Sequence, residues 1–279
     1  MLESLRHFLL IVEHGTFTEA ARRAHLSQPA LTQSIHKLEG ELDARLFVRG
    51  RRGAELTAQG EALVPRARAA LAAIEEGRRA VREVNDLTRG EVRIGAGGTA
   101  CTYLLPPIVA AFRREHPSVR FLLRETAPDE ALAALEAGEL DLAAVTAEGG
   151  ELWFQDALVL IAAPGTKARG APHVTFSPGS SSRTLLEQHF PEAEIVMELG
   201  SIAAVKGHVR SGVGVALVSK HAVKTDVALG RLVIVRDRRT PIARPIHLVH
   251  RGLDRLPPAA AALRERMLAK PARVADPES

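Results

Sequence analysis

The sequence predicts an α/β protein made of three parts: a small helical unit, one long helix, and a larger unit in which strands and helices alternate. Residues 1–57 have the pattern of short helices joined by tight turns, and residues 58–88 that of one helix rich in Ala, Arg and Glu. From Glu91 onward strand-like and helical runs alternate, which is typical of a parallel sheet with right-handed crossovers. We therefore expect domain boundaries after residues 57 and 88.

The composition is that of an ordinary globular protein. Of 279 residues, 46% are hydrophobic and 25% are charged, which argues against a disordered, fibrous or membrane-embedded chain. No apolar run approaches the roughly 20 residues of a spanning helix. The N-terminus lacks the charge order of a signal peptide, so we expect a cytoplasmic protein without a membrane partner. Cys101 is the only cysteine, which excludes an internal disulfide and a cysteine-based zinc site. The net charge of +4 does not by itself indicate a polyanionic partner.

The first unit contains two consecutive short helices. Thr18–Ala24 carries small residues that permit close helix approach, and Thr18 is its expected N-cap. Ser27 is the expected N-cap of the next helix, and Pro29 lies in its first turn, where a missing N–H group costs little. The apolar residues of this second helix recur at helical spacing and predict one buried stripe: Leu31, Ile35, Leu38 and Leu42.

The opposite face of the second helix is polar. Two short helices, the second polar along one face, describe a helix-turn-helix whose second helix enters the major groove of DNA. The basic loop Arg49–Gly53 follows and would form a wing along the neighbouring phosphates. We expect Gln28, Thr32 and Gln33 to read bases, and Lys37 with the loop arginines to hold phosphates. On periodicity alone, a small helical bundle with a solvated polar face is the alternative. The candidate residues for contact with double-stranded DNA are Ser27, Gln28, Pro29, Thr32, Gln33, His36, Lys37, Arg49, Arg51 and Arg52.

The first 60 residues resemble, without a gap, the signature of LysR-type transcriptional regulators. The matching positions are Phe8, Ala20, Ala21, Leu26–Leu31, Ile35, Leu38, Glu39, Leu46, Phe47, Arg49, Leu56, Thr57 and Gly60. The resemblance implies a sequence-specific regulator with a winged helix-turn-helix. Two positions depart from the family pattern. Thr32 stands where Ser is usual, and His36 occupies a position that is often basic, so the charge there depends on pH.

The long helix carries an apolar seam with heptad spacing, which indicates helix pairing. The seam consists of Leu63, Ala67, Ala70, Ile74, Gly77, Val81, Val84 and Thr88. Because Ala and Gly bury little area, the coiled coil is weak by itself, and Pro65 is expected to bend the N-terminal end. An amphipathic helix lying on its own domain is the alternative. The family resemblance favours pairing and implies a homodimer or homotetramer that presents two DNA-binding heads.

The C-terminal unit contains two sets of strand-like runs. The first set is Val92–Ala96, Val119–Glu125 and Leu140–Val145, with helical runs at Tyr103–Glu115 and Pro128–Ala137. The second set is Ala157–Ala163, His173–Ser177, Glu194–Leu199, Val213–Ser219 and Leu232–Val235, with a helix expected at Ile202–Arg210. A late strand-like run, Ile246–His250, is expected to return to the first set.

A glycine-rich turn, Gly95–Ala100, follows the first of these strands and precedes a helix. It resembles a dinucleotide-binding turn, and Glu125 lies near the place of a ribose-binding acid, so an NAD(P)-dependent oxidoreductase is the alternative function. The helix opens with Pro106-Pro107, however, and no coherent set of acid, base and nucleophile accompanies the turn. We therefore expect no catalytic residues, no cofactor and no metal ion. Free N–H groups and the helix dipole at Thr99–Thr102 favour a small anion instead.

Hydroxyl-bearing residues begin two further helices, at Ser180–Thr184 and at Gly200-Ser201. Because ligands of open α/β sheets bind where crossovers diverge, the three helix starts could converge on one cleft between two subdomains. Each is otherwise an ordinary N-cap. Cys101 lies near the first helix start, where a lowered thiol pKa would suit a peroxide sensor. Without a second cysteine to resolve it, a buried or cleft-wall thiol is the favoured interpretation.

Residues 91–250 resemble the effector-binding domain of the same family, whose fold resembles periplasmic solute-binding proteins. The matching pieces are Val92–Ala96, Leu104–Pro106, Phe112, Pro117, Gly138–Leu142 and Val209–Ala216. The resemblance implies an effector domain at 89–270, with one subdomain at about 89–160 plus 246–270 and the other at about 161–245. We expect a small anionic effector, with RNA polymerase as a further candidate partner. The implied effector-binding residues are Gly98, Thr99, Ala100, Cys101, Ser180, Ser181, Ser182 and Ser201.

Overall fold

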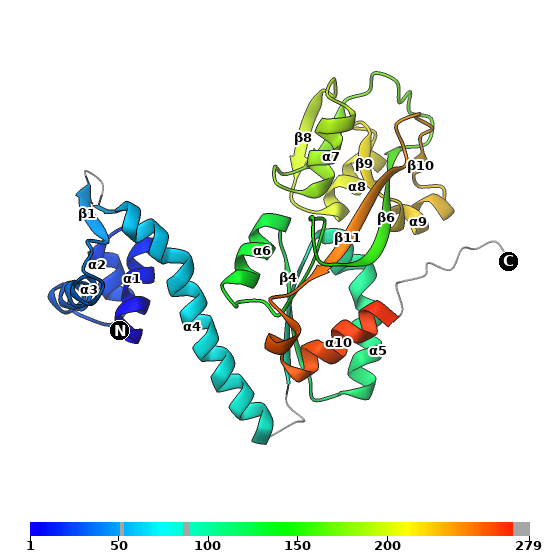
Figure 1. The fold of residues 1–279 in the computed structure, drawn as a ribbon. Helices are drawn as coiled ribbons and strands as arrows, with labels where there is room; N and C mark the ends of the chain where they lie inside the picture. The colour runs from blue at the N-terminus through cyan, green and yellow to red at the C-terminus, as the bar shows by residue number, and fades with distance from the viewer. Residues whose placement is uncertain (51–52, 86–89, 270–279) are drawn as a thin grey trace. The chain divides into compact units, whose positions relative to one another are not determined.

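The computed structural model describes residues 1–50, 53–85 and 90–269 (Figure 1). The chain divides into two compact units, with the boundary after Asn85. The first unit is mainly helical and the second combines a sheet with covering helices, which confirms the predicted α/β class. Among the described residues, no helix is both long and apolar enough to span a bilayer.

The first unit is a winged helix-turn-helix followed by a long helix. Its elements are α1 (Leu2–His14), α2 (Phe17–Arg23), α3 (Gln28–Leu42), β1 (Phe47–Gly50), β2 (Gly53–Leu56) and α4 (Ala58–Asn85). The apolar faces of the first three helices meet in one core, in which Phe8, Ile11 and Leu31 are fully buried. The ring of Phe47 lies 5.3 and 5.5 Å from the rings of Phe8 and Phe17, so aromatic packing anchors the wing to the helical body.

Side-chain caps hold the turns around α2 and α3. The cap of α2 is Thr16 and not Thr18, because the helix begins directly after Thr16; its hydroxyl accepts a hydrogen bond from Glu19 N at 3.2 Å. Ser27 caps α3 as predicted, accepting a hydrogen bond from Ala30 N at 3.3 Å. In each of these two helices, the cap side chain therefore satisfies one backbone N–H group of the first turn.

The buried stripe of α3 ends one turn earlier than predicted. Three of its four residues are buried, whereas Leu42 is 41% exposed. The helix stops at Leu42 and Asp43 enters the left-handed region with a φ of 48°, so the last turn lies at the edge of the core. Glu39 takes the buried position instead, and its carboxylate accepts a hydrogen bond from Leu46 N at 2.8 Å. This bond ties the recognition helix to the chain that enters the wing.

The wing is a short antiparallel hairpin. Phe47 pairs with Leu56 at its base, and Gly50 pairs with Gly53 at its tip. Beneath it, the first turn of α4 packs against the chain that leads into β1. A Cβ atom on Gly60 would lie only 2.3 Å from the carbonyl oxygen there, so only glycine permits this approach.

The first part of α4 belongs to the core of the helix-turn-helix. The helix is continuous through Pro65. Leu63 and Ala67, the first two positions of the predicted seam, pack against the apolar core of the helix-turn-helix. The alternative interpretation, a helix lying on its own domain, is therefore correct for this end of α4.

The remainder of the seam is accessible. Ile74 and Val81 expose 37% and 65% of their surface in the single chain. Because exposed apolar side chains at heptad spacing suit a second helix, the pairing prediction now rests on residues 70–81. The side chain of Val84 and all of Thr88 lie outside the described residues.

The second unit is built on a mixed sheet rather than a purely parallel one. Its strands are β3 (Glu91–Ala96), β4 (Arg120–Glu125), β5 (Leu142–Val145), β6 (Glu151–Ala162), β9 (Ala216–Ser219), β10 (Val233–Ile234) and β11 (Ile242–Val249). They lie in the order β10-β6-β11-β5-β3-β4, with β9 beside β6. The parallel prediction is correct for β3, β4 and β5 and wrong for the other four, which pair antiparallel. The connection from β5 to β6 is too short for the helical crossover that a parallel arrangement needs.

Helices cover both faces of the sheet and form two subdomains (Figure 1). In the first subdomain, α5 and α10 pack on one face and α6 on the other. In the second, α8 and α9 pack with β9 and with a separate parallel pair, β7 and β8. The helices, helical turns and remaining strands of this unit are η1, a π-helical turn (Ala100–Leu104), α5 (Leu105–Glu115), α6 (Pro128–Glu136), β7 (His173–Phe176), α7 (Ser181–His189), β8 (Ile195–Leu199), α8 (Ile202–Arg210), α9 (Lys220–Ala228), the 3-10 turn η2 (Leu253–Arg255) and α10 (Pro258–Ala269).

Strands β6 and β11 run through both subdomains as an antiparallel pair. Both begin before the predicted starts at Ala157 and Ile246. Asp156 on β6 and Arg244 on β11 interrupt the apolar runs that the prediction followed, and the two residues are direct partners in the strand register. Helices α9 and α10 have no counterpart among the predicted elements.

Candidate functional site

One face of α3 presents accessible polar side chains. The residues follow the helical repeat on the side opposite the buried stripe. All are exposed except Thr32, which is half-buried. They are Gln28, Thr32, Gln33, His36 and Lys37. The structure thus brings together the part of the predicted DNA-binding set that lies on this helix.

A groove runs between this face of α3 and the wing. Its lining includes Thr18 of α2, Gln28 and His36 of α3, and Val48 of β1. The Thr18 hydroxyl donates a long hydrogen bond, 3.5 Å, to the side-chain oxygen of Gln28. Because this bond uses the amide oxygen of Gln28, the two N–H groups of the same amide remain available as donors.

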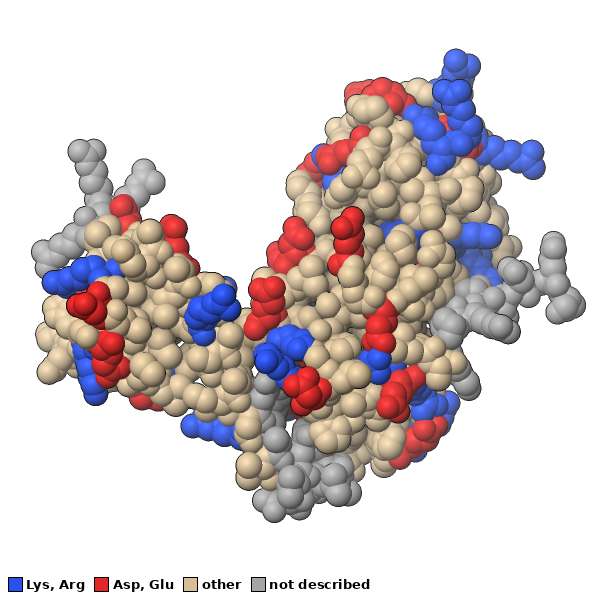
Figure 2. Space-filling model, viewed as in Figure 1, with Lys and Arg blue, Asp and Glu red and all other residues tan. Residues whose placement is uncertain are grey.

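The wing carries the predicted phosphate contacts. Arg49 lies in β1, while its side chain, Arg51 and Arg52 fall outside what the structure describes. On the face drawn in Figure 2, basic and acidic side chains are interspersed over the first unit. This face of the first unit therefore presents no broad positive surface among its described residues.

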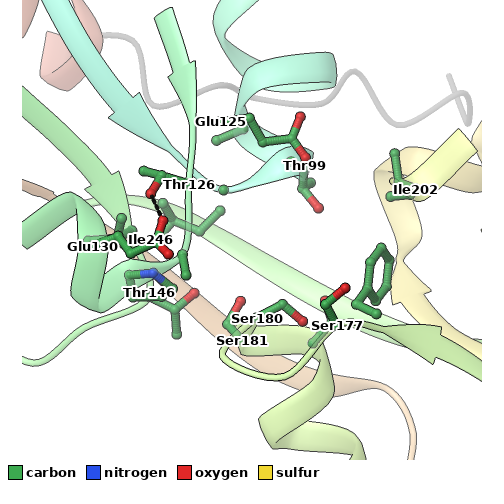
Figure 3. A pocket seen from close by; sticks show the side chains of 18 of the residues that line it. Thr99, Glu125, Thr126, Glu130, Thr146, Ser177, Ser180, Ser181, Ile202 and Ile246 are labelled. Atoms are coloured by element: carbon green, nitrogen blue, oxygen red, sulfur yellow. Dashed lines mark hydrogen bonds between the residues drawn. The ribbon is translucent and has the colours of Figure 1, made fainter. Parts of the chain in front are cut away.

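The second unit contains a pocket of about 250 Å³ between its subdomains. Strands β3, β4 and β5 of one subdomain and β7 and β8 of the other all end at this pocket, and the segments that follow them form its lining. Figure 3 shows the hydroxyls of Ser177, Ser180 and Ser181 on one side, with Thr99 and Glu125 across from them. The pocket thus occupies the position where open α/β sheets bind ligands.

Arg244 lines this pocket and is only 5% exposed. Its Nε and Nη2 both donate to Asp156 Oδ2, the Nε bond at 3.1 Å. Nη2 also donates to Thr99 Oγ1 at 2.8 Å. Nη1 donates to Ser182 Oγ at 2.9 Å and to Ser181 Oγ at 3.3 Å. A guanidinium has five N–H groups, so every donor of Arg244 is already engaged.

These bonds join the two subdomains and orient three hydroxyls. Thr99 belongs to the first subdomain and Ser181 and Ser182 to the second, while Arg244 and Asp156 lie on the crossing strands. Because arginine cannot accept a hydrogen bond, each hydroxyl accepts from Arg244 and keeps its own O–H for another partner. We call Thr99, Ser181 and Ser182 the hydroxyl floor. Within the described chain, none of the three O–H groups has an acceptor.

The same pocket has an acidic wall, formed by Glu125 and Glu130. Thr126 Oγ1 donates to Glu130 Oε2 at 2.7 Å. Among residues 1–50, 53–85 and 90–269, no hydrogen bond or ion pair engages the Glu125 carboxylate. A Cβ atom on Gly98 would lie 2.7 Å from Glu125 Oε1, so this glycine makes room for the carboxylate. The positive charge of Arg244 is balanced by Asp156, whereas no cation among the described residues pairs with the wall.

Two family models match the chain. The model described as "Bacterial regulatory helix-turn-helix protein, lysR family" matches residues 2–61, and "LysR substrate binding domain" matches residues 85–272, more than half of the chain. The protein belongs to the LysR family of transcriptional regulators. It is a DNA-binding transcriptional regulator with an effector-binding domain, and its fold is the winged helix-turn-helix and two-subdomain α/β arrangement that the sequence predicts.

Relatives of this LysR protein are themselves regulators. A RuBisCO operon transcriptional regulator of Allochromatium vinosum is 29% identical over 294 residues, covering 98% of this chain and 97% of the relative. A probable RuBisCO transcriptional regulator of Trichormus variabilis is 32% identical over 258 residues, covering 83% and 77%. The crystal structure of CbnR, a LysR family regulator, has a TM-score of 0.68 at 22% identity and covers 98% of this chain and 100% of CbnR. Full-length CbnR complexed with its target DNA gives a TM-score of 0.66 at 23% identity, covering 98% and 100%.

The pocket between the subdomains of this LysR protein gathers six of the eight residues that the sequence suggested. The six are Gly98, Thr99, Ala100, Ser180, Ser181 and Ser182. Ser201 lies outside the lining and serves as the N-cap of α8, accepting a hydrogen bond from Ala204 N at 3.2 Å. Ser180 also caps its helix, so the ordinary-cap interpretation holds for both. The geometry supports the predicted binding role of the six, which stays a prediction.

Cys101 also lies outside the pocket lining. Its thiol is 3.5 Å from the carbonyl oxygen of Ala96 and packs against the core of the first subdomain. Burial and, to a smaller degree, the charge of Glu125 raise the pKa of Cys101 to about 11. The hypothesis of a lowered thiol pKa is therefore wrong, since a thiol that stays protonated reacts slowly with peroxide.

Sequence reasoning missed Arg244, Asp156 and the role of the acidic wall. One signal was present. Ile242, Ile246 and Leu248 alternate along β11 and point into the core, and Arg244 occupies the same face. A charged residue in the apolar phase of a strand indicates a buried ion pair. The described residues contain no cluster of three or more His, Cys, Asp or Glu side chains suited to a metal ion.

Proposed function

We propose that this regulator binds operator DNA by inserting α3 into the major groove. Gln28, Thr32 and Gln33 read base edges, while Lys37 and the arginines of the wing hold the flanking phosphates. The observation that carries the proposal is the accessible polar face of α3 beside a wing hairpin. The match to the lysR helix-turn-helix model supports it. Such a protein acts on the chromosome in the cytoplasm, and RNA polymerase is its proposed protein partner.

Two copies of the chain pair through α4, forming a homodimer or a dimer of dimers. The exposed apolar residues of the seam, Ile74 and Val81, supply the contact. Two reading heads on one face of DNA occupy half-sites roughly 34–36 Å apart, or multiples of that spacing. This division into a DNA-binding domain at 1–57, a linker helix at 58–88 and an effector domain at 89–270 remains part of the proposal.

A small effector with an acidic group binds in the pocket between the two subdomains. The three O–H donors of the hydroxyl floor point to an acceptor such as a carboxylate. Because the network of Arg244 includes residues of both subdomains, an effector that engages the floor changes the balance between open and closed arrangements. Control of transcription requires that the effector bind one arrangement more tightly than the other.

The base-reading role is tested with DNA fragments that the purified protein retains, its own upstream region included. We expect Gln28→Ala to weaken binding to the selected operator by about ten- to a hundredfold, because one bidentate base contact contributes roughly 1–3 kcal/mol. Binding to random DNA should hardly change. Gln188→Ala, an exposed glutamine on α7, is the matched control. Equal losses on operator and random DNA would show that Gln28 does not specify sequence.

A further inference from the structure

The pocket between the subdomains has an acidic wall on one part of its surface and a floor of hydroxyl donors on another, and this combination restricts its ligand. We propose that the pocket binds a small zwitterion, an amino acid or a close relative, whose ammonium group lies at the acidic wall and whose carboxylate lies on the hydroxyl floor. The inference rests on the proposed effector function and specifies the class of ligand for the same site.

The hydroxyl floor requires an acceptor. Thr99 and Ser182 are each only 7% exposed, and both accept hydrogen bonds from Arg244. Their O–H groups find no acceptor in the described part of the chain, and a buried donor without a partner costs free energy. A ligand carboxylate accepts several donors at once and satisfies the floor. Arg244 itself cannot donate to the ligand, because all its N–H groups are engaged.

The acidic wall requires a cation. Glu125 and Glu130 come from different elements, the end of β4 and the first turn of α6, and both line the pocket. Within the described residues, Glu130 accepts a hydrogen bond from the hydroxyl of Thr126 alone, and no cation neutralises Glu125. Figure 2 shows acidic side chains gathered over α6 on this face of the effector domain. A dianionic ligand would meet two uncompensated carboxylates, whereas an ammonium group would be attracted by both.

Neither requirement alone defines a site, but the two occur in one cavity. The acidic wall would repel a ligand that carries only negative charge. A ligand that carries only positive charge would leave the O–H groups of the hydroxyl floor without an acceptor. The cavity of about 250 Å³ suits a molecule of amino-acid size. Glu125 and Glu130 both line this cavity, so the wall forms part of the pocket surface (Figure 3).

The test is isothermal titration calorimetry of the full chain with three sets of probes. The standard L-amino acids are the zwitterions, glutarate and malate the anions, and putrescine the cation. For the amino acid that binds most tightly, the deaminated acid and the decarboxylated amine are the matched analogues. We expect both analogues to bind at least about tenfold more weakly, since each loses one charge-assisted interaction.

Variants then assign the two ends of the ligand. Glu125→Gln and Glu130→Gln should each weaken amino-acid binding about tenfold while leaving the deaminated acid unchanged or more tightly bound. Thr99→Val should weaken the deaminated acid and leave the amine unchanged. Glu265→Gln on α10 is the control, because this glutamate is exposed and outside the pocket. Thermal melting of each variant confirms that it is folded.

The outcomes separate this inference from the proposed function. If glutarate or malate binds and amino acids do not, or if neither Gln variant weakens amino-acid binding, the ligand class is wrong while effector binding stands. If no probe binds, the ligand class is overturned. Operator binding is measured on the same samples, so a failure of the DNA-binding proposal is seen independently.

Discussion

Arg244 and Asp156 form a buried ion pair in the effector domain. The two side chains are 5% and 0% exposed, and the pair crosses between the two strands that connect the subdomains. Three hydroxyl groups and Ser219, which donates to Asp156 at 2.8 Å, complete the network. Removing one partner of a buried ion pair destabilises a protein far more than replacing both partners with apolar residues.

Arg244→Met therefore should lower the free energy of unfolding of the effector domain by about 3–5 kcal/mol, because Asp156 is left buried without a counter-ion. Urea denaturation followed by the fluorescence of Trp153, the only tryptophan, measures the change. The double variant Arg244→Met with Asp156→Leu should recover most of the loss. A single variant that costs less than about 1 kcal/mol would mean that the charge is not effectively buried.

Two glycines of the DNA-binding unit have opposite roles. Gly60 lies against the backbone of Leu46, where a Cβ atom would come within 2.3 Å of a carbonyl oxygen. Gly40, within α3, has no neighbouring atom within 4 Å of the same position.

Gly60→Ala should destabilise the DNA-binding unit by about 1–3 kcal/mol, because rigid backbone must move to admit the methyl group. Gly40→Ala should stabilise it by about 0.5–1 kcal/mol, since alanine is the better helix former. Differential scanning calorimetry of the full chain measures both. A neutral Gly60→Ala would show that the wing shifts freely against α4.

At the scale of elements, β7 carries a buried histidine, His173, whose neutral form is favoured by its surroundings. Both ring nitrogens of His173 are buried and have no hydrogen-bond partner among the described residues, and the ring lies 5.9 Å from that of Phe190. Burial lowers the pKa of His173, with Glu192 acting in the opposite direction and Arg239 in the same one. The folded pKa is below the unfolded value of about 6.5, so the unfolded chain takes up a proton first. Stability therefore decreases as the pH falls below about 6.5.

His173→Leu should remove part of this pH dependence. Urea denaturation at pH 7.5 and pH 5.5 measures the difference in unfolding free energy for each protein. We expect a smaller difference in the variant, because leucine fills the apolar site without a titrating group. An unchanged pH dependence would assign it to other groups, among them His221, whose pKa burial also lowers.

The proposed pairing of two copies depends on the seam of α4. Ile74→Glu combined with Val81→Glu should convert the protein to monomers of 30.0 kDa, because two charges would face each other along the paired helices. Light scattering after size-exclusion chromatography measures the mass. Ala69→Glu, at an exposed position outside the seam, is the control and should leave the oligomer intact. A double variant that remains dimeric would place the main interface elsewhere.

At the scale of the whole molecule, pairing and DNA recognition are linked. A dimer should protect two half-sites in a DNase footprint, with centres roughly 34–36 Å apart or at a multiple of that spacing. The Ile74→Glu, Val81→Glu protein should protect a single half-site and only at higher concentration, because it loses the advantage of joined heads. Equal protection by both proteins would show that each head binds independently.

The helix-turn-helix could be read from the sequence because its signals are local. The caps, the buried stripe and the polar face of α3 all lie within a few residues of one another, and periodicity places them on opposite sides of one helix. Errors arose where local signals compete. Thr16 and Thr18 are both good caps, and Leu42 continues the apolar period although the helix ends there.

The effector pocket is different. The hydroxyl residues at the helix starts could be listed from the sequence, but their surroundings could not. Thr99, Asp156 and Arg244 are far apart in the chain, and they meet only because β6 and β11 pair antiparallel through both subdomains. That pairing engages every donor of Arg244, while no cation of the described residues neutralises Glu125, and the ligand class that we propose rests on this charge balance. The sequence by itself determined the helix-turn-helix, since its caps, buried stripe and polar face depend on single helices and short turns; tertiary structure alone decided the surroundings of the pocket, since burial and charge balance are properties of residues brought together from distant segments.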